Sequence, residues 1–300
     1  MTDVFECCTL CPRNCRVSRH ARAGYCGERD VLRISRAALH YWEEPCISGT
    51  RGSGTVFFVG CALKCSHCQN FDISRSRGGG EISAARLCEI FFELKEKGAH
   101  NINLVTPSHF TPLIVEAIGA AKARGFDLPF VWNSSGYESV ETIKKLDGYV
   151  DVFLPDFKYI SPDTADKYSA ARDYPEVAKA ALDEMVKIAG EPRFDADGMM
   201  TRGVIVRHLV LPSHAAESIE ILKYLNMKYG SAIYVSIMNQ YTPMKSEAHP
   251  ELSRRLTTYE YQKVLAAAEK IGIKNGFIQA GETQKESFIP PFDMTGVYSP

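Results

Sequence analysis

Three cysteines close together in the chain are the residues best suited to chemistry. The segment Gly60–Asn70 reads GCALKCSHCQN and spaces Cys61, Cys65 and Cys68 as C-x3-C-x2-C. Three thiolates on one short loop can converge on a single cluster, but they cannot by themselves complete a tetrahedral zinc site. An ordinary 4Fe–4S cluster takes four cysteines, so three would leave one iron open to a substrate or cofactor. A structural zinc loop is the alternative.

A second group of cysteines lies near the start of the chain and follows the pattern C-x2-C-x3-C-x10-C. Its members are Cys8, Cys11, Cys15 and Cys26. Four thiolates at this spacing could close a structural zinc site, and a second iron–sulfur cluster would use the same ligands. Zinc is preferred, because the spacing does not match a bacterial ferredoxin run. Cys7 and Cys46 are alternative ligands, whereas Cys88 is expected to pack in the core.

The overall composition excludes several classes of protein. Thirty-five basic against thirty-six acidic side chains give a net charge of −1, which is not the charge of a nucleic-acid-binding protein, although a local basic patch is compatible with it. No run approaches 18 apolar residues, so no membrane span is expected. The opening residues, MTDVFECCTLCPRN, do not resemble a signal peptide. We therefore expect a cytoplasmic protein whose clustered thiols bind metal.

Apolar runs that alternate with helical patterns predict the fold. Strands are expected at 55–60, 101–105, 129–132, 149–154, 203–210 and 232–237. Helices are expected at 83–97, 111–124, 138–146, 175–189, 215–228 and 257–271. Such β/α units are joined by right-handed crossovers, and six units fall short of the eight in a closed barrel. The sequence therefore predicts an α/β partial (β/α)6 TIM-like barrel, with a doubly wound open sheet as the alternative.

The cysteine content and the frequency of apolar runs change near residue 50. Residues 1–50 hold six cysteines and few apolar runs, so we expect a small cysteine-rich metal-binding segment made of short turns. Residues 51–300 are expected to form the barrel.

Charged residues follow two of the predicted strands. In both architectures ligands bind at the carboxyl ends of strands, so the residues after each apolar run are the candidates. Asp156 and Lys158 are two positions apart and can enter the same cavity. Arg207 lies inside an apolar strand and needs an anionic partner or water, whereas His208 points to the opposite face and is expected to pack.

The stretch GTVFFVGCALKCSHCQNFDIS resembles the signature of the radical S-adenosylmethionine (SAM) superfamily, in particular its pyruvate formate-lyase-activating-enzyme-related, PflX-like branch. The segments CPRNC, NINLVTPSH, LPDFKY and VRHLVLP extend the resemblance over most of the chain. The resemblance implies that Cys61, Cys65 and Cys68 hold a catalytic 4Fe–4S cluster whose open iron binds SAM. Reductive cleavage would then give methionine and a 5′-deoxyadenosyl radical that abstracts hydrogen.

The resemblance also implies residues that bind the cofactor. Family members often hold the methionine amino group with a Gly-Gly-Glu segment after the second strand. This chain has Thr106 and Ser108 there, and its Gly79-Gly80-Glu81 lies before the first helix, where it is expected to form a loop. Thr106 and Ser108 are therefore the candidates for the amino group.

The remaining cofactor contacts are expected after the third, fourth and fifth strands. Asn133 and Ser135 offer polar groups to the ribose or carboxylate, although a tight turn would use the same residue types. Asp156 and Lys158 resemble the motif that contacts the methionine moiety. Arg207 resembles the family arginine near the carboxylate or ribose.

These features predict an oxidoreductase of the activating-enzyme kind that abstracts hydrogen from a peptide or protein, such as a glycyl-radical enzyme. It would need an electron donor such as a flavodoxin or ferredoxin. A small-molecule substrate is one alternative. A non-catalytic metal-binding adaptor, in which Asp156, Lys158 and Arg207 are structural charges, is the other.

Overall fold

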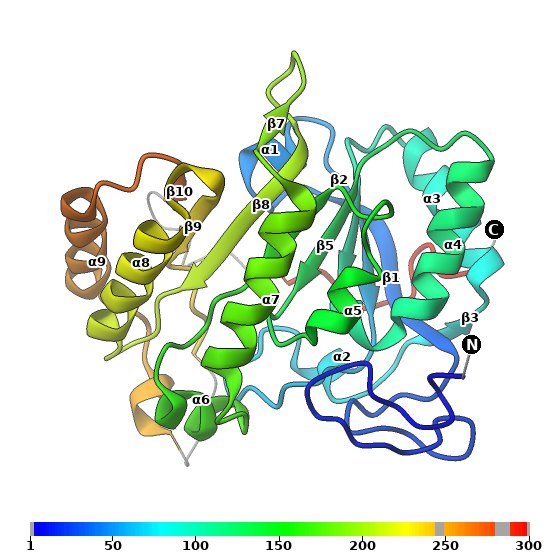
Figure 1. Cartoon of the computed structure of the whole chain (residues 1–300), viewed down its shortest axis with the longest axis horizontal. Coiled ribbons are helices and arrows are strands. Elements are labelled where there is room, and N and C mark those ends of the chain that lie inside the picture. Colours follow the sequence, from blue (N-terminus) through cyan, green and yellow to red (C-terminus); the bar gives the residue numbers. More distant parts are fainter. Residues whose placement is uncertain (1–2, 244–248, 280–288, 299–300) are drawn as a thin grey trace.

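A sheet of parallel strands forms the centre of the protein in a computed structural model that describes residues 3–243, 249–279 and 289–298 (Figure 1). The six predicted strands are all present, as β2 (Ser53–Phe58), β4 (Ile102–Val105), β5 (Phe130–Ser134), β6 (Val152–Pro155), β8 (Met200–Leu209) and β9 (Tyr234–Met238). They are parallel neighbours in that order, and β10 (Gly276–Ile278) extends the sheet beyond β9. The first four are buried along their whole length, which explains their continuous apolar sequences.

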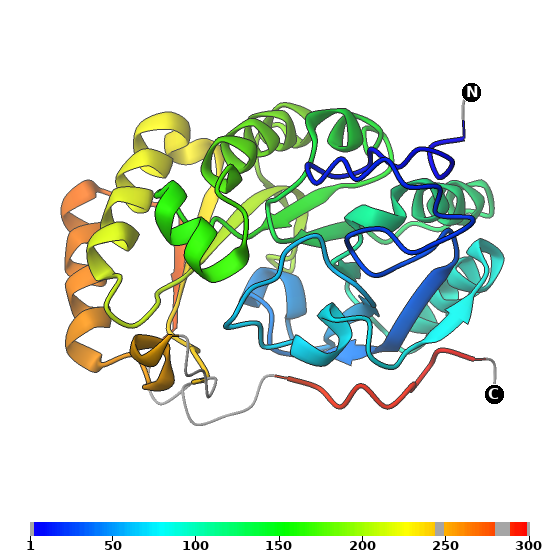
Figure 2. The ribbon, with the colours of Figure 1, turned by 90° about the horizontal axis from the view of Figure 1, so that it is seen from below.

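Helices connect the strands and lie around the outside of the sheet (Figure 2). The six predicted helices are present as α3 (Ala84–Glu96), α4 (Thr111–Ala123), α5 (Val140–Lys144), α7 (Tyr174–Ala189), α8 (Ala215–Tyr229) and α9 (Thr258–Ile271). Ser83 caps α3 as expected, because its hydroxyl accepts a hydrogen bond from the Arg86 amide. The sequence does not predict the short helices α1 (Pro45–Ser48), α2 (Phe71–Ser74) and α6 (Pro162–Ser169), or the 3-10 turns at 108–110, 230–232 and 250–253.

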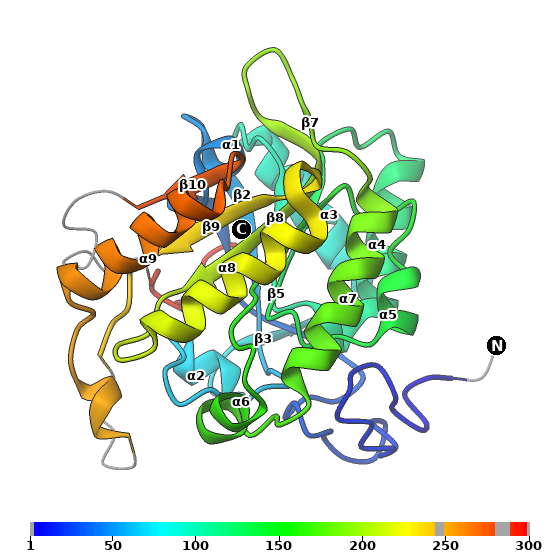
Figure 3. The ribbon, with the colours of Figure 1, turned by 60° about the vertical axis from the view of Figure 1, so that its left-hand side comes forward.

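The sheet does not close on itself, since its two ends in the described part of the chain are β10 and β3 (Gly80–Ile82). The predicted partial barrel is therefore confirmed. An antiparallel strand, β1 (Leu32–His40), pairs with β2 from His40–Ser53 to Ile34–Phe58 and is not predicted by the sequence. The short strand β7 (Arg193–Phe194) and β8 form a hairpin that projects beyond the sheet (Figure 3).

The start of the chain wraps around one end of the barrel. Residues 3–31 contain turns but neither helix nor strand, whereas β1 belongs to the sheet. The boundary expected near residue 50 therefore falls between two paired strands, and the division into a segment and a barrel stays a prediction. Arg19 is fully buried and ties the segment to the barrel, because its guanidinium donates to the His109 carbonyl at 2.5 Å.

The last described residues run along the outer edge of β1 (Figure 2). The Met294 amide donates to the Ser35 carbonyl at 3.0 Å, and the Ala37 amide donates to the Thr295 carbonyl at 2.8 Å. Val297 is fully buried in the main core, so this segment is packed as well as hydrogen-bonded. Among the described residues, no helix is both long enough and apolar enough to cross a membrane.

Candidate active site

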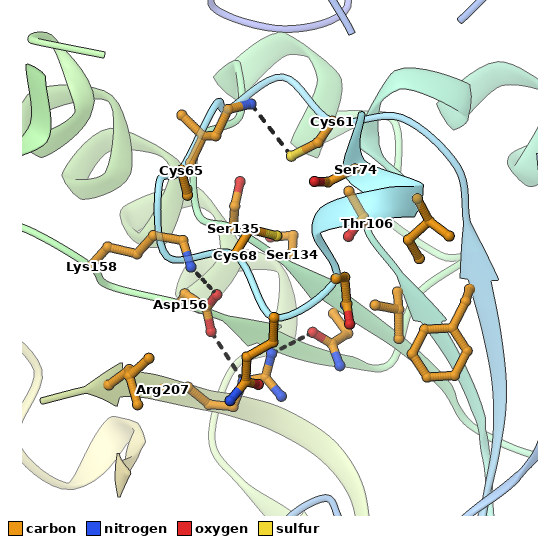
Figure 4. Close-up of a pocket in the computed structure, with 18 of the residues that line it drawn as sticks. Cys61, Cys65, Cys68, Ser74, Thr106, Ser134, Ser135, Asp156, Lys158 and Arg207 are labelled. Carbon is orange, nitrogen blue, oxygen red and sulfur yellow. Dashed lines mark hydrogen bonds and ion pairs between the residues drawn. The ribbon is translucent and has the colours of Figure 1, made fainter. Parts of the chain in front are cut away.

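One cavity collects the chemistry-bearing residues at the carboxyl ends of the strands (Figure 4). Its walls include nearly all of the residues predicted there: Cys61, Cys65, Cys68, Thr106, Asn133, Ser135, Asp156, Lys158 and Arg207. Strands β2, β4, β5, β6 and β8 each contribute at least one of them, directly or through the following loop. The parallel topology therefore assembles a site from residues that are up to 146 positions apart in the sequence.

The loop after β2 holds the three cysteines between fixed neighbours. It begins at Gly60, whose φ of +86° suits glycine, and a Cβ there would lie 2.4 Å from the Glu28 side chain. Farther along, the Ser66 amide donates to the Tyr168 carbonyl at 2.8 Å, and the Ser169 hydroxyl donates to the Cys65 sulfur at 3.0 Å. Contacts from both sides thus hold the loop over the cavity.

The thiols of this loop are held in an environment that disfavours charge. Burial, together with the neighbouring Cys65 and Cys68, raises the pKa of Cys61 to about 12. Burial and Cys65 also raise the pKa of Cys68. Without a cation the Cys61 and Cys68 thiols would remain protonated, and bound metal would replace their protons.

The donor set fits an iron–sulfur cluster chemically. In residues 3–243, 249–279 and 289–298, no three or more His, Cys, Asp or Glu side chains are arranged to hold a metal ion. The fit therefore rests on the donor type and placement, because three thiols share one cavity and thiolates are the usual ligands of such clusters.

Four charged side chains form a continuous ladder along the cavity. Lys158 Nζ lies 2.5 Å from Asp156 Oδ2, and Asp156 Oδ1 accepts from Arg207 Nε at 3.2 Å. Arg207 Nη1 then donates to Glu43 Oε2 at 2.9 Å. Two positive and two negative groups alternate, so the ladder is neutral overall. Because each charge is paired with an opposite one, the pairing offsets the free-energy cost of partly removing the four charged groups from water.

Opposite charges within the ladder shift the pKa values of Asp156 and Lys158 so that both side chains favour their charged forms. Burial alone would raise the pKa of Asp156, but Lys158 and Arg207 bring it below its ordinary value. Burial would lower the pKa of Lys158, but Asp156 raises it above its ordinary value. Both groups are therefore charged at neutral pH.

Glu43 belongs to this cavity, although the sequence does not single it out. It lies in the corner between β1 and α1, and its Oε1 accepts hydrogen bonds from Asn103 at 2.8 Å and Asn133 at 3.3 Å. Arg207 also donates to Asn133 Oδ1, at 2.6 Å. Three nitrogens of Arg207 are thus bonded to protein groups, and Asp156 and Glu43 are the anionic partners expected for an arginine inside an apolar strand. Its expected contact with the cofactor stays a prediction.

The loop after β4 separates two residues that the sequence groups together. Thr106 lines the cavity with a left-handed φ of +60°, a strained conformation for a residue other than glycine. Ser108 does not line it, because its hydroxyl donates to the fully buried carboxylate of Glu138. Trp132 Nε1 and the Ser134 hydroxyl donate to the same carboxylate, at 2.8 and 2.5 Å. The structure therefore brings Thr106, but not Ser108, to the cavity.

The N-terminal cysteines come together as a second group. Cys8, Cys11 and Cys26 are buried and Cys15 is partly exposed. Burial, with smaller contributions from Cys26, Cys8 and Cys15, raises the pKa of Cys11 to about 12. Of the alternative ligands, Cys7 is exposed, and Cys46 packs in a separate apolar cluster against β6 and β8.

Two of the predicted packing residues are where they were expected. Cys88 is buried in the main core. His208 is buried as well, with Nδ1 2.8 Å from the Phe157 carbonyl and Nε2 2.9 Å from the Ser218 hydroxyl. The expected Gly-Gly-Glu loop runs into β3 at the edge of the sheet, away from the cavity residues.

The sequence model of the radical SAM superfamily matches residues 55–225, more than half of the chain and the whole stretch from β2 to most of α8. The chain belongs to the radical SAM superfamily. Membership implies an enzyme that uses a 4Fe–4S cluster and SAM. Most residues that line the cavity lie within the matched range, whereas His40, Trp42 and Glu43 precede it.

Two relatives of this radical SAM protein match different lengths of the chain. The uncharacterised protein MJ0674 of Methanocaldococcus jannaschii is 30% identical over 280 residues, which cover 90% of this chain and 77% of the relative. The pyruvate formate-lyase-activating enzyme of Clostridium pasteurianum is 29% identical over 113 residues, 36% of this chain and 46% of the relative. The expected resemblance to activating enzymes is therefore confirmed, over about a third of the chain.

A solved structure shows the same fold. The FeFe-hydrogenase maturase HydG from Carboxydothermus hydrogenoformans superimposes with a TM-score of 0.51 at 12% identity, covering 76% of this chain. This radical SAM protein spans about half of the maturase, 53% of its length. At that identity the likeness concerns the fold alone.

Proposed function

We propose that this protein cleaves SAM reductively at a 4Fe–4S cluster held by Cys61, Cys65 and Cys68, and that the resulting 5′-deoxyadenosyl radical takes a hydrogen atom from a peptide or protein substrate. The observation that carries the proposal is the single cavity in which these three cysteines face the charged ladder. Family membership supplies the cofactors, and the cavity supplies residues whose chemistry suits them.

The residues of the cavity would divide the work of binding. Lys158, the outermost cation of the ladder, is the best candidate to attract the methionine carboxylate, with Asp156 positioning it. Thr106, Asn133 and Ser135 present polar atoms at the ends of β4 and β5, where they would orient the rest of the cofactor. Arg207 acts mainly by holding Asp156 and Asn133 in place, because its nitrogens bond to them.

A macromolecular substrate is favoured by two observations. The Clostridium pasteurianum relative is named for activating pyruvate formate-lyase, itself an enzyme. In addition, Trp42 lines the cavity while remaining 54% exposed, so an aromatic side chain extends from the site to the surface. A protein segment could use such a side chain as a contact. A small-molecule substrate is the alternative within the same chemistry.

We also propose that residues 1–50 form a metal-binding segment in which Cys8, Cys11, Cys15 and Cys26 hold zinc or a second iron–sulfur cluster. The number and spacing of these cysteines and the burial of Cys8, Cys11 and Cys26 support this assignment. Thiolate ligands need reducing surroundings, so we place the protein in the cytoplasm, where a flavodoxin or ferredoxin would supply electrons.

Anaerobic metal analysis combined with a SAM cleavage assay tests the proposal. The expected result is about four irons per chain at the ladder cavity, together with one zinc, and formation of 5′-deoxyadenosine when dithionite is the reductant. About eight irons without zinc would assign a second cluster to the N-terminal cysteines. A reconstituted protein that holds zinc but no iron, and forms no 5′-deoxyadenosine, would refute the enzyme and favour the metal-binding adaptor.

A further inference from the structure

Three backbone groups beyond the ends of β5 and β6 meet at one buried hydroxyl. Tyr174 is the first residue of α7, and its side chain is fully buried. Its hydroxyl accepts a hydrogen bond from the Lys158 amide at 2.9 Å. Its single proton is shared between the carbonyl oxygens of Ser135 and Asp156, each 2.9 Å away. One side chain that does not itself line the cavity therefore contacts the backbone of three residues that do.

The hydroxyl takes over where the neighbouring strand no longer supplies partners. Strand β6 ends at Pro155, and the residues after it leave the sheet one by one. The Phe157 amide still donates to the Arg207 carbonyl of β8, at 2.8 Å, whereas the Lys158 amide donates to Tyr174. A backbone amide that is shielded from water is costly unless it finds an acceptor. The hydroxyl thus fixes the point at which the backbone of Lys158 turns away from the sheet.

The two loops that share this hydroxyl approach each other closely at Gly136. Its φ is +73°, and a Cβ there would lie 2.3 Å from the Asp156 carbonyl oxygen and 3.2 Å from the Tyr174 hydroxyl. Any larger residue would push the loops after β5 and β6 apart. Glycine at this position lets one hydroxyl bond to both loops.

Aromatic packing holds the ring of Tyr174 in place. It stacks on Tyr137, with ring centroids 6.1 Å apart and an interplanar angle of 12°, and it meets the edge of Tyr159 at 5.4 Å. On the side of the N-terminal segment, the Arg13 guanidinium lies 5.1 Å from the centroid of the Tyr137 ring. Burial raises the pKa of Tyr174, so its hydroxyl keeps the proton that it donates. The position of the hydroxyl is therefore set by packing as well as by the bonds that it makes.

We propose that Tyr174 is a positioning residue for SAM, because its hydroxyl holds the backbone of Lys158 so that the ammonium group stays available to the methionine carboxylate. The inference rests on the proposed function, since Tyr174 acts only through residues that would bind SAM. A tether of this kind needs to prevent only a small movement. Misplacement of a binding group by about 1 Å can cost about 100-fold in rate.

Hydrogen exchange of the backbone amides tests the tether in the full-length protein without any cofactor bound. In the unmodified protein the Lys158 amide should be protected, although it lies beyond the last residue of β6. In Y174F, which keeps the ring but loses the hydroxyl, this amide should exchange at least about tenfold faster while the amides of α4 stay within about twofold. An unprotected Lys158 amide in the unmodified protein would overturn the proposal, even if Y174F fails to fold. Equal exchange of this amide in both proteins would overturn it as well.

SAM binding to the reconstituted enzyme distinguishes positioning from a purely structural role. Y174F should retain its iron, and its Kd for SAM should rise about fivefold, measured by equilibrium dialysis well below the temperature of unfolding. In a K158A background the same substitution should change the Kd by less than about twofold, because the group that the hydroxyl positions is gone. Equal fold-changes in both backgrounds would assign Tyr174 to the fold alone and overturn the proposal.

The matched control is Y261F, which removes another buried hydroxyl that bonds to backbone on two sides. Tyr261 donates to the Ile237 carbonyl at 2.8 Å and accepts from the Gln279 amide at 3.2 Å, and none of these three residues lines the cavity. Y261F should lose stability but keep its Kd for SAM within about twofold. A rise in the Kd equal to that of Y174F would contradict a specific role for Tyr174.

Failure of the proposed function would look different. An unmodified, reconstituted protein that binds no SAM and forms no 5′-deoxyadenosine would refute the proposed function itself. SAM cleavage by the unmodified protein, together with an unchanged Kd in Y174F, would refute only the role of Tyr174.

Discussion

The contact between Glu43 and Arg207 leads to the most direct prediction. The side chains of Glu43 and Arg207 are only 9% and 16% exposed, so both charged groups have lost most of their contact with water. They lie 2.9 Å apart, and each charge stabilises the other. Replacing Glu43 by Gln keeps the shape but removes the charge, and it should cost about 2 kcal/mol of unfolding free energy, the usual value of a hydrogen bond to a charged group. Replacing Arg207 by Met should cost about 3–5 kcal/mol, because two carboxylates then face each other with one cation fewer.

A double-mutant cycle measures whether the two residues interact. The cost of E43Q/R207M should be smaller than the sum of the single costs by about 1–3 kcal/mol, measured by anaerobic urea denaturation. The exposed pair Lys144–Glu141, with side chains 48% and 80% exposed, is the matched control and should couple by less than about 0.5 kcal/mol. If the changes in unfolding free energy at Glu43 and Arg207 add to within about 0.5 kcal/mol, the ladder is refuted, and Arg207 becomes a candidate to contact the cofactor directly.

Four further predictions concern single residues of the site. C65A should fold but lose iron and at least 100-fold of its SAM cleavage, and retained cleavage would show that another residue binds the cluster. K158A should keep its iron while its Kd for SAM rises at least tenfold, a loss of about 1.4 kcal/mol, so loss of iron would move Lys158 to a structural role. S108A should leave the Kd for SAM within twofold but destabilise the protein by about 1–2 kcal/mol, since the buried carboxylate loses a donor; a large effect on SAM binding would contradict the placement of Ser108. His40 lines the cavity, and burial, aided by Arg36 and Arg207, lowers its pKa to about 4. The unfolded chain then takes up the proton first, so stability is lost as pH falls from about 6.5 to about 4; H40Q should lack this part of the pH dependence, and an unchanged curve would refute it.

The parallel strands could be predicted because each one forms a continuous run of apolar residues in the sequence. A strand such as β2, which is buried on both faces, appears as a continuous apolar run. Strand β1 does not, because it alternates buried Leu32 and Ile34 with partly exposed Arg33 and Arg36. The six cysteines among residues 1–50 instead favour a prediction of short turns for this part of the chain. Its role became visible only through the pairing with β2.

Only part of the candidate site could be predicted from the sequence. Asp156, Lys158 and Arg207 follow or end strands, so the rule for parallel sheets finds them without any knowledge of contacts. Glu43 could not be found in this way, since its bond to Arg207 joins residues 164 positions apart. Ser108 was misplaced for a similar reason: the carboxylate that captures its hydroxyl comes from 30 residues farther along the chain.

The anchoring of Arg13 has a consequence for how the protein is made. Its guanidinium donates to the Ala170 carbonyl at 2.6 Å, a partner 157 residues later in the chain. During synthesis at about 5–20 residues per second, the N-terminal segment would wait roughly 8–30 s before that partner leaves the ribosome. For that interval the segment lacks its contact with Ala170, although its partners Ala62 and His109 emerge earlier, so the first five cysteines are only partly anchored and remain open to oxidants and metal ions. The cell's supply of metal and reductant during translation, rather than the finished fold, would then decide what the segment carries.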